Sequence, residues 1–129
     1  MFRSSAFEMT LDYLKERKQF GVAVGSFQAL QHRMAVLYSE LEVSKAIVQR
    51  GLAALDEGSA EVSMLASLAK AKLSDLFKQV ACESIQLHGG IGMTDEHDIG
   101  FFMKRSHVTA ELFGNAGFHR DRYAGILEF

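Results

Sequence analysis

The sequence predicts an all-α protein, an antiparallel up-and-down four-helix bundle with a short extra C-terminal helix. Apolar residues recur at helical spacing through most of the 129 residues, and no β-branched runs indicate strands. Proline is absent from the whole sequence, so long helices can run without interruption. The length is typical of one domain with a real core, so a single domain over residues 1–129 is expected.

A first amphipathic helix is expected over residues 5–16. Its apolar side carries Phe2, Ala6, Met9 and Tyr13. The pattern then breaks over residues 17–25, which contain a short apolar trio between two glycines. Ser26 follows as the expected N-cap of the next helix, because its hydroxyl can accept an amide hydrogen bond from the first turn.

Two long helices should form a hairpin in the middle of the chain. The second helix is predicted to place on one seam Phe27, Leu30, Met34, Leu37, Leu41, Val48, Leu52 and Leu55, with Ser44 filling one expected position. This seam continues for about eight turns. Gly58 should end the helix and Ser59 should cap the third one. The seam of the third helix is predicted to contain Val62, Leu65, Ala69, Leu73, Leu76 and Val80. The short connection favours antiparallel packing of the pair.

The third helix should stop at residues 86–94, where three glycines fall within four residues. Thr94 is expected to cap a fourth helix that directs Ile99, Phe102 and Met103 toward the core. That helix should end near residues 113–115, and a last amphipathic piece is expected over residues 118–127.

Composition excludes several classes of function. The net charge of −2, without a basic cluster, argues against nucleic-acid binding. No apolar run is long enough to span a membrane, and no signal peptide is present, so a cytoplasmic protein is expected. The single cysteine, Cys82, is interpreted as a buried small hydrophobic residue of a protein in a reducing compartment. The five histidines lack metal-ligand spacing, so no metal site is predicted.

The two glycine-bearing connectors should lie at the same end of the helical hairpin. Arg17 and the backbone amides around Gly89 to Gly92 would then address one anionic ligand such as a phosphate, within one subunit or across a symmetric interface. The alternative is purely structural. The Gly-Gly pair would be a helix C-cap and turn, and Arg17 a solvated cation at a helix end. The glycine pattern is neither a Rossmann fingerprint nor a P-loop.

Three motifs, in this order and spacing, resemble the C-terminal helical domain of acyl-CoA dehydrogenases over nearly the whole chain. They are Arg17-Lys18-Gln19-Phe20-Gly21, Phe27-Gln28-Ala29-Leu30-Gln31-His32, and the run from Gln86 to Thr94. The resemblance implies that Arg17, with Gln19 and Phe20, reaches the diphosphate of FAD bound to a neighbouring subunit. It also implies a cofactor contact for Gln28. The segment that lines the adenosine-diphosphate part of FAD would be Gln86, Leu87, His88, Gly89 and Gly90.

The chain departs from this family at the position of the catalytic base. Most members carry a glutamate immediately before a Gly-Thr or Gly-Ser pair, and here Phe113 precedes Gly114-Asn115. Phenylalanine cannot accept a proton, so no catalytic residue is assigned. Two explanations stay open. The base lies on the helix leading into the Arg17 connector, upstream of Met1, or the parent is a non-catalytic subunit of a heteromeric enzyme. The run from Leu112 to Asn115, followed by the run from His119 to Arg122, favours the second.

The resemblance therefore implies a cofactor and assembly domain, without the N-terminal helical and central β domains, that is excised from a longer protein. The parent would use FAD to oxidise an acyl-CoA to the trans-2-enoyl-CoA and pass electrons to an electron-transfer flavoprotein. It would be a homo- or hetero-oligomer, and the isolated chain is expected to be inactive. The alternative is a stand-alone helical interaction module without flavin, in which the seam is mainly an oligomer interface.

Overall fold

The structure, a computed structural model, describes the backbone of residues 2–129 and the side chains from residue 5 onward. It is all-α, as predicted. The five α-helices are α1 (Phe2–Glu16), α2 (Gln28–Asp56), α3 (Val62–His88), α4 (Ile99–Glu111) and α5 (Ala116–Ile126). Short 3₁₀ turns, Val24–Ser26 and Gly89–Met93, precede α2 and follow α3. The predicted place of Phe2 on the apolar side of α1 lies outside the described side chains.

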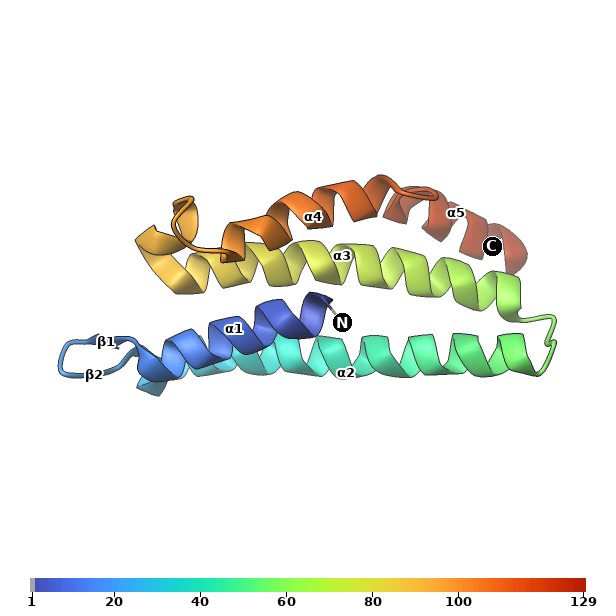
Figure 1. Cartoon of the computed structure of the whole chain (residues 1–129). Helices are drawn as coiled ribbons and strands as arrows, with labels where there is room; N and C mark the ends of the chain where they lie inside the picture. Colours follow the sequence, from blue (N-terminus) through green and yellow to red (C-terminus); the bar gives the residue numbers. More distant parts are fainter. Residues whose placement is uncertain (1) are drawn as a thin grey trace.

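The helix α3 is the centre of the bundle, because each of the other four helices packs against it. The helices α2 and α3 run antiparallel. The helix α1 lies beside the half of this pair that contains the start of α2 and the end of α3 (Figure 1). The helices α4 and α5 lie end to end along the side of α3 that is opposite to α1 and α2, so together they take the place of one long helix in the bundle (Figure 1). The predicted extra C-terminal helix is therefore the continuation of α4 after a break.

The core follows the predicted seam through the first half of α2 and then departs from it. Leu37, Val80 and Ile99 are almost completely buried. Leu52 and Leu55, both predicted on the seam, are 57% and 61% exposed, whereas Ala54 is fully buried. Leu52 and Leu55 instead line an open groove between α2 and α3, together with Val62, Leu65 and Ala69. They stay exposed because α1 lies beside the other half of the α2–α3 pair and does not cover this groove (Figure 1).

The predicted helix caps at Ser26, Ser59 and Thr94 are corrected by the structure. Ser26 Oγ donates to Ala23 O at 2.7 Å, and Thr94 Oγ1 donates to Ile91 O at 2.8 Å, so neither hydroxyl caps the next helix. Ser26 ends one 3₁₀ turn and Thr94 directly follows the other, and both hydroxyls bond carbonyls of these turns or of the residue before them.

The starts of α3 and α4 are satisfied in other ways. Ser59 Oγ accepts the amide of Glu61 at 3.2 Å, but α3 begins only at Val62. The amide of Ile99 at the start of α4 donates to Nδ1 of His97, at 3.2 Å, which provides the acceptor expected from Thr94.

The connector after α1 contains a small hairpin that the sequence did not predict. Strands β1 (Lys18–Gln19) and β2 (Val22–Ala23) pair antiparallel with Lys18 opposite Ala23. The two residues between them, Phe20 and Gly21, both have positive φ, 56° and 78°. This is the geometry of a two-residue type I′ turn, which normally prefers Asn-Gly and so gives a weak signal when a phenylalanine comes first.

Cys82 is exposed on α3, which corrects its interpretation as a buried residue. The helical spacing places it between two core positions, Ala81 and Ser84, but on the outer side of the helix. Among the helices of the described residues, none is long and apolar enough to cross a membrane.

Two glycines allow the close contacts that bring the connectors onto the bundle. A Cβ on Gly25 would lie 2.7 Å from Leu14 O, and a Cβ on Gly92 would lie 2.7 Å from Ile85 O. Gly92 thus lets the turn after α3 fold back onto the last turns of that helix. A Cβ on Gly90, in the same turn, would meet nothing within 4 Å.

We expect Gly92→Ala to lower the free energy of unfolding by about 1–3 kcal/mol, because the new methyl group overlaps a backbone oxygen that cannot move freely. Gly90→Ala is the matched control and should change it by less than about 0.5 kcal/mol. Urea unfolding followed by circular dichroism measures both. Equal midpoints for the two variants would contradict the close contact at Gly92.

Candidate functional site

A cavity of about 550 Å³ opens at the end of the bundle that carries the β1–β2 hairpin, between the connector after α1 and the turn after α3. Its lining combines cationic, amide, aromatic and glycine residues. The lining residues are Tyr13, Arg17, Gln19, Phe20, Val24, Phe27, Leu30, Arg33, Gln86, Leu87, His88, Gly89, Gly90 and Ile91. Eight of the nine predicted site residues are among them, and the ninth, Gln28, lies at the exposed start of α2 outside the lining.

Arg17 is the cation at the mouth of this cavity, and its backbone is fixed on both sides. Its amide donates to Tyr13 O and its carbonyl accepts the amide of Val24, both at 2.8 Å. The side chain is exposed, and its guanidinium has no ion-pair partner among the described residues. An unpaired guanidinium on a fixed backbone offers several N–H donors to an anion.

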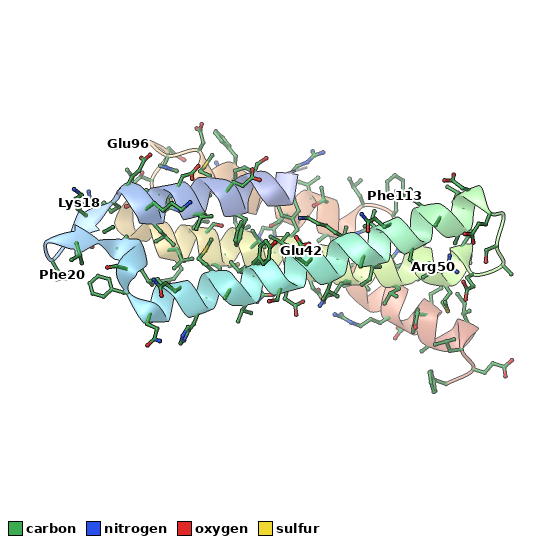
Figure 2. The ribbon with its side chains drawn as sticks, turned by 90° about the horizontal axis from the view of Figure 1, so that it is seen from below. Lys18, Phe20, Glu42, Arg50, Glu96 and Phe113 are labelled. Atoms are coloured by element: carbon green, nitrogen blue, oxygen red, sulfur yellow. The ribbon has the colours of Figure 1, made fainter. Side chains whose placement is uncertain are left out.

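Phe20 projects from the tip of the β1–β2 hairpin and remains 88% exposed. Its ring stands clear of the ribbon in Figure 2 and meets Phe27 edge to face, with 6.1 Å between ring centroids. Phe20 is one of three non-glycine residues with positive φ in the described chain, together with Phe113 and Glu128. Such backbone geometry costs free energy and is concentrated at functional turns in proteins.

The glycine turn differs in one respect from the predicted row of free amides. The amide of Gly89 donates to Gln86 O, because Gly89 (φ 67°) ends α3 and starts a 3₁₀ turn that runs to Met93. This amide is therefore not available to a ligand. A Cβ added to Gly89 or Gly90 would meet nothing within 4 Å, so both residues leave open space beside the cavity.

His88 lines the cavity but is almost completely buried, with 3% of its surface exposed. Its Nδ1 lies 2.7 Å from Ser84 O, and a carbonyl only accepts, so Nδ1 carries the proton. Nε2 is then an acceptor, and among the side chains that the structure describes it has no hydrogen-bond partner. The ring stacks on Tyr13, whose hydroxyl donates to His88 O at 3.2 Å. Burial lowers the pKa of His88 below its ordinary value, and nearby His97 lowers it further.

Two lining residues, Tyr13 and Arg33, were not predicted as site residues. Tyr13 lies four residues before Arg17, on the same side of a helix, so the spacing contained a signal that was assigned to the core. Arg33 pairs with Glu83 at 2.7 Å, and this hydrogen bond raises the pKa of Arg33 above its ordinary value. No local pattern marks Arg33, because its partner is 50 positions away.

Phe113 lies away from this cavity, in the turn between α4 and α5. It is 90% exposed and has a φ of 60°, and its ring stands clear of the ribbon in Figure 2. The structure thus contains two separate candidate regions, the cavity at the hairpin end and this turn. In the part of the chain that the structure describes, no three His, Cys, Asp or Glu side chains cluster as metal ligands.

Comparisons with known proteins agree with the resemblance. The family model "Acyl-CoA dehydrogenase, C-terminal domain" matches residues 2–127. Acyl-CoA dehydrogenase IpdE2 of Mycolicibacterium smegmatis is 41% identical over 111 residues, which are 86% of this chain and 34% of that protein. An acyl-CoA dehydrogenase structure from Geobacillus kaustophilus matches with a TM-score of 0.94 at 29% identity, covering 98% of this chain and 33% of its own. An FAD complex of PigA matches with a TM-score of 0.92 at 25% identity, over 98% and 33% of the two chains. The chain spans about a third of the length of these proteins.

The lowered pKa of His88 predicts a pH dependence of stability. Above a pH of about 6.5 the imidazole is neutral in both the folded and the unfolded chain. Below this pH the unfolded chain binds the proton first, so the free energy of unfolding should fall until the pH passes the lower pKa of the folded state. Urea unfolding between pH 8 and pH 5 measures this loss.

His88→Phe, which keeps an aromatic ring beside Tyr13, should lose less stability over this range than the wild type. His107→Gln, at an exposed position, should behave as the wild type does. If His88→Phe and the wild type fall in parallel, the titration of His88 does not contribute.

Proposed function

Because the chain belongs to the acyl-CoA dehydrogenase family and matches its C-terminal domain, we propose that it forms the FAD-binding and oligomerisation domain of a flavin-dependent acyl-CoA dehydrogenase. The parent enzyme oxidises an acyl-CoA thioester to the trans-2-enoyl-CoA. The observation that carries this proposal is the shared cavity, in which an unpaired arginine faces a glycine turn at one end of the bundle.

The cavity chemistry fits the diphosphate of FAD. Arg17 supplies a positive charge with several N–H donors, and charge-assisted hydrogen bonds to phosphate are stronger than neutral ones. Gly89 and Gly90 leave open space where other residues would place a Cβ, so a phosphate can approach the backbone there. Gln19 and Gln86 add side-chain amides to the same lining. Gln28 lies outside the lining, and its role stays a prediction.

The aromatic residues of the cavity fit the adenosine part of the cofactor. Phe20 and Phe27 form an edge-to-face pair beside Arg17, and Phe20 exposes most of its ring. An exposed ring held by a hairpin offers an apolar surface on which a purine can stack. A volume of about 550 Å³ accommodates part of a dinucleotide rather than all of it. The remaining contacts would come from other parts of the enzyme.

FAD, when bound, would supply the hydride acceptor for oxidation of the acyl-CoA. The described residues of this chain do not provide a proton acceptor at position 113, so the base comes from elsewhere in the parent enzyme. It lies on a helix upstream of the Arg17 connector or on a partner subunit. The part played by this domain is to bind the diphosphate and to hold subunits together.

An oligomeric parent agrees with the exposed apolar residues of α2. Val36 and Val43 are about half exposed and lie seven residues apart, so they share one side of the helix, away from the bundle core. Such a stripe is typical of a surface that packs against another subunit.

An electron-transfer flavoprotein would take the electrons from the reduced parent.

Arg17→Gln in the full-length parent should weaken FAD binding by about 10- to 150-fold, because a charged hydrogen bond contributes roughly 1.5–3 kcal/mol. The flavin absorbance retained per subunit and the Kd from flavin fluorescence measure this loss. Lys18→Gln is the matched control, since Lys18 is the next residue and lies outside the cavity lining. An equal effect of both variants would indicate a general charge effect and would remove the role assigned to Arg17.

The isolated 129-residue chain should bind FAD weakly or not at all, because one open cavity supplies only part of the contacts that a dinucleotide needs. Gel filtration of the chain mixed with excess FAD should give a colourless protein peak. A stoichiometric yellow complex would show that this domain is a sufficient flavin site.

A further inference from the structure

Arg33 is a second arginine in the wall of the cavity, and it comes from a different element than Arg17. It lies on α2, after Phe27 and Leu30, and all three of these residues line the cavity. Among the described residues of this lining, none is an aspartate or a glutamate. The cavity therefore has a local excess of positive charge, although the whole chain has a net charge of −2.

Glu83 fixes the side chain of Arg33. Nε of Arg33 donates to Glu83 Oε2 at 2.7 Å, and Nη2 of Arg33 lies 2.7 Å from the same oxygen. The carboxylate thus occupies one edge of the guanidinium. Nη1 of Arg33, with its two N–H groups, has no hydrogen-bond partner in the part of the chain that the structure describes. Arg33 therefore keeps donors that a ligand can use.

The arrangement of these two side chains favours an anion as the ligand. Glu83 comes from α3 and does not belong to the cavity lining, whereas Arg33 does. A ligand in the cavity consequently meets the N–H donors of the pair and not the carboxylate. Because the ion pair already holds the guanidinium, binding costs less side-chain entropy than it would with a free arginine.

The other polar groups of the lining bind an anion less well than the two arginines do. Nε2 of the buried His88 is an acceptor, so its lone pair repels an oxyanion. The amide of Gly89 already donates to Gln86 O. The side-chain amides of the lining are neutral donors, and their hydrogen bonds to phosphate are weaker than those of a guanidinium. The charged contacts in the described lining are thus Arg17 and Arg33.

We propose that Arg33, oriented by Glu83, is a second anion-binding residue of the cavity, and that Arg17 and Arg33 together select a nucleoside diphosphate over a monophosphate. This inference rests on the proposed function and adds a specificity-determining residue to it. A diphosphate has two linked anionic groups, so it can bind two arginines from different elements at the same time. A monophosphate bound to Arg17 leaves Arg33 without an anion.

The selection is tested with ADP and AMP as competitors of FAD in the full-length parent. FAD is removed, and its rebinding is followed by flavin fluorescence in the presence of either nucleotide. Arg33→Gln should raise the inhibition constant of ADP at least about tenfold, the effect of losing a charged hydrogen bond, and that of AMP less than about threefold. An unchanged constant for ADP, or an equal loss for ADP and AMP, would overturn the assignment.

Arg50→Gln is the matched control for Arg33→Gln. Arg50 also lies on α2 and forms ion pairs, with Glu57 and with Glu61, but it is not part of the cavity lining. Both inhibition constants should stay at their wild-type values in this variant. If Arg50→Gln weakens ADP as much as Arg33→Gln does, the effect is one of overall charge and Arg33 has no specific role.

A charge swap separates contact with the ligand from a purely structural role of the ion pair. Arg33→Glu combined with Glu83→Arg keeps an ion pair between α2 and α3 but removes the guanidinium from the lining. If Arg33 contacts the diphosphate, the double variant should bind ADP no better than Arg33→Gln does. If the swap restores the wild-type affinity for ADP, the pair only supports the fold and the proposal is wrong.

The 129-residue chain gives an answer that does not depend on flavin. Inorganic pyrophosphate and orthophosphate are titrated into the ¹⁵N-labelled chain, and the shift of the Gly90 amide signal measures binding. The wild type should bind pyrophosphate at least about tenfold more tightly than orthophosphate, and Arg33→Gln should reduce this ratio to less than about threefold. Equal affinities for the two anions in the wild type would contradict a second anion-binding residue.

These outcomes separate the inference from the proposed function. A parent that binds no FAD, in a chain that still selects pyrophosphate through Arg33, would refute the proposed function and leave the diphosphate preference of the cavity. A parent that binds FAD, with competition by ADP that is insensitive to Arg33→Gln, would leave the proposed function intact and refute the role of Arg33.

Discussion

The bundle depends on one constraint, that α3 is in contact with every other helix. The turn with Gly89 and Gly90 follows the C-terminal end of α3 and lies against the connector after α1. In the N-terminal half of α3, Ser67 contacts α5 through a hydrogen bond with His119. Both candidate regions are therefore built on one continuous helix. Because an α-helix is stiff over this length, the distance between the two regions is fixed by α3 rather than by the loops that carry them.

One phenylalanine in each region, Phe20 or Phe113, has a left-handed backbone conformation. Different contacts stabilise this conformation in the two regions. At Phe20 the strain is offset by strand pairing on both sides of the turn and by Gly21 beside it. At Phe113 it is offset by side chains that approach from α3 and α5. In each case the backbone is fixed and the ring is left free. A fixed backbone with an exposed side chain suits a residue that contacts a ligand, because binding then does not have to order the backbone first.

The helices and the meeting of the two connectors could be predicted from the sequence, and much of the remaining detail could not. Periodic apolar residues and the absence of proline locate the five helices, because these signals are local. The exposure of Leu52 and Leu55 depends on which other helices cover the second half of α2, and the periodicity of α2 alone does not record this. Arg33 and His119 depend on partners about 50 positions away. The exposed Cys82 shows that an apolar stretch still has an outer side.

The hydrogen bond from His119 goes to the carbonyl of residue 113 and not to its side chain. The conformation of the turn is consequently independent of which amino acid stands there, provided that the residue tolerates a positive φ. A substitution at this position can exchange an ionisable group for an aromatic ring without disturbing the rest of the fold. The residues whose identity the turn does depend on are Gly114, whose φ of 95° favours glycine, and Ser67 and His119, which carry the hydrogen bonds.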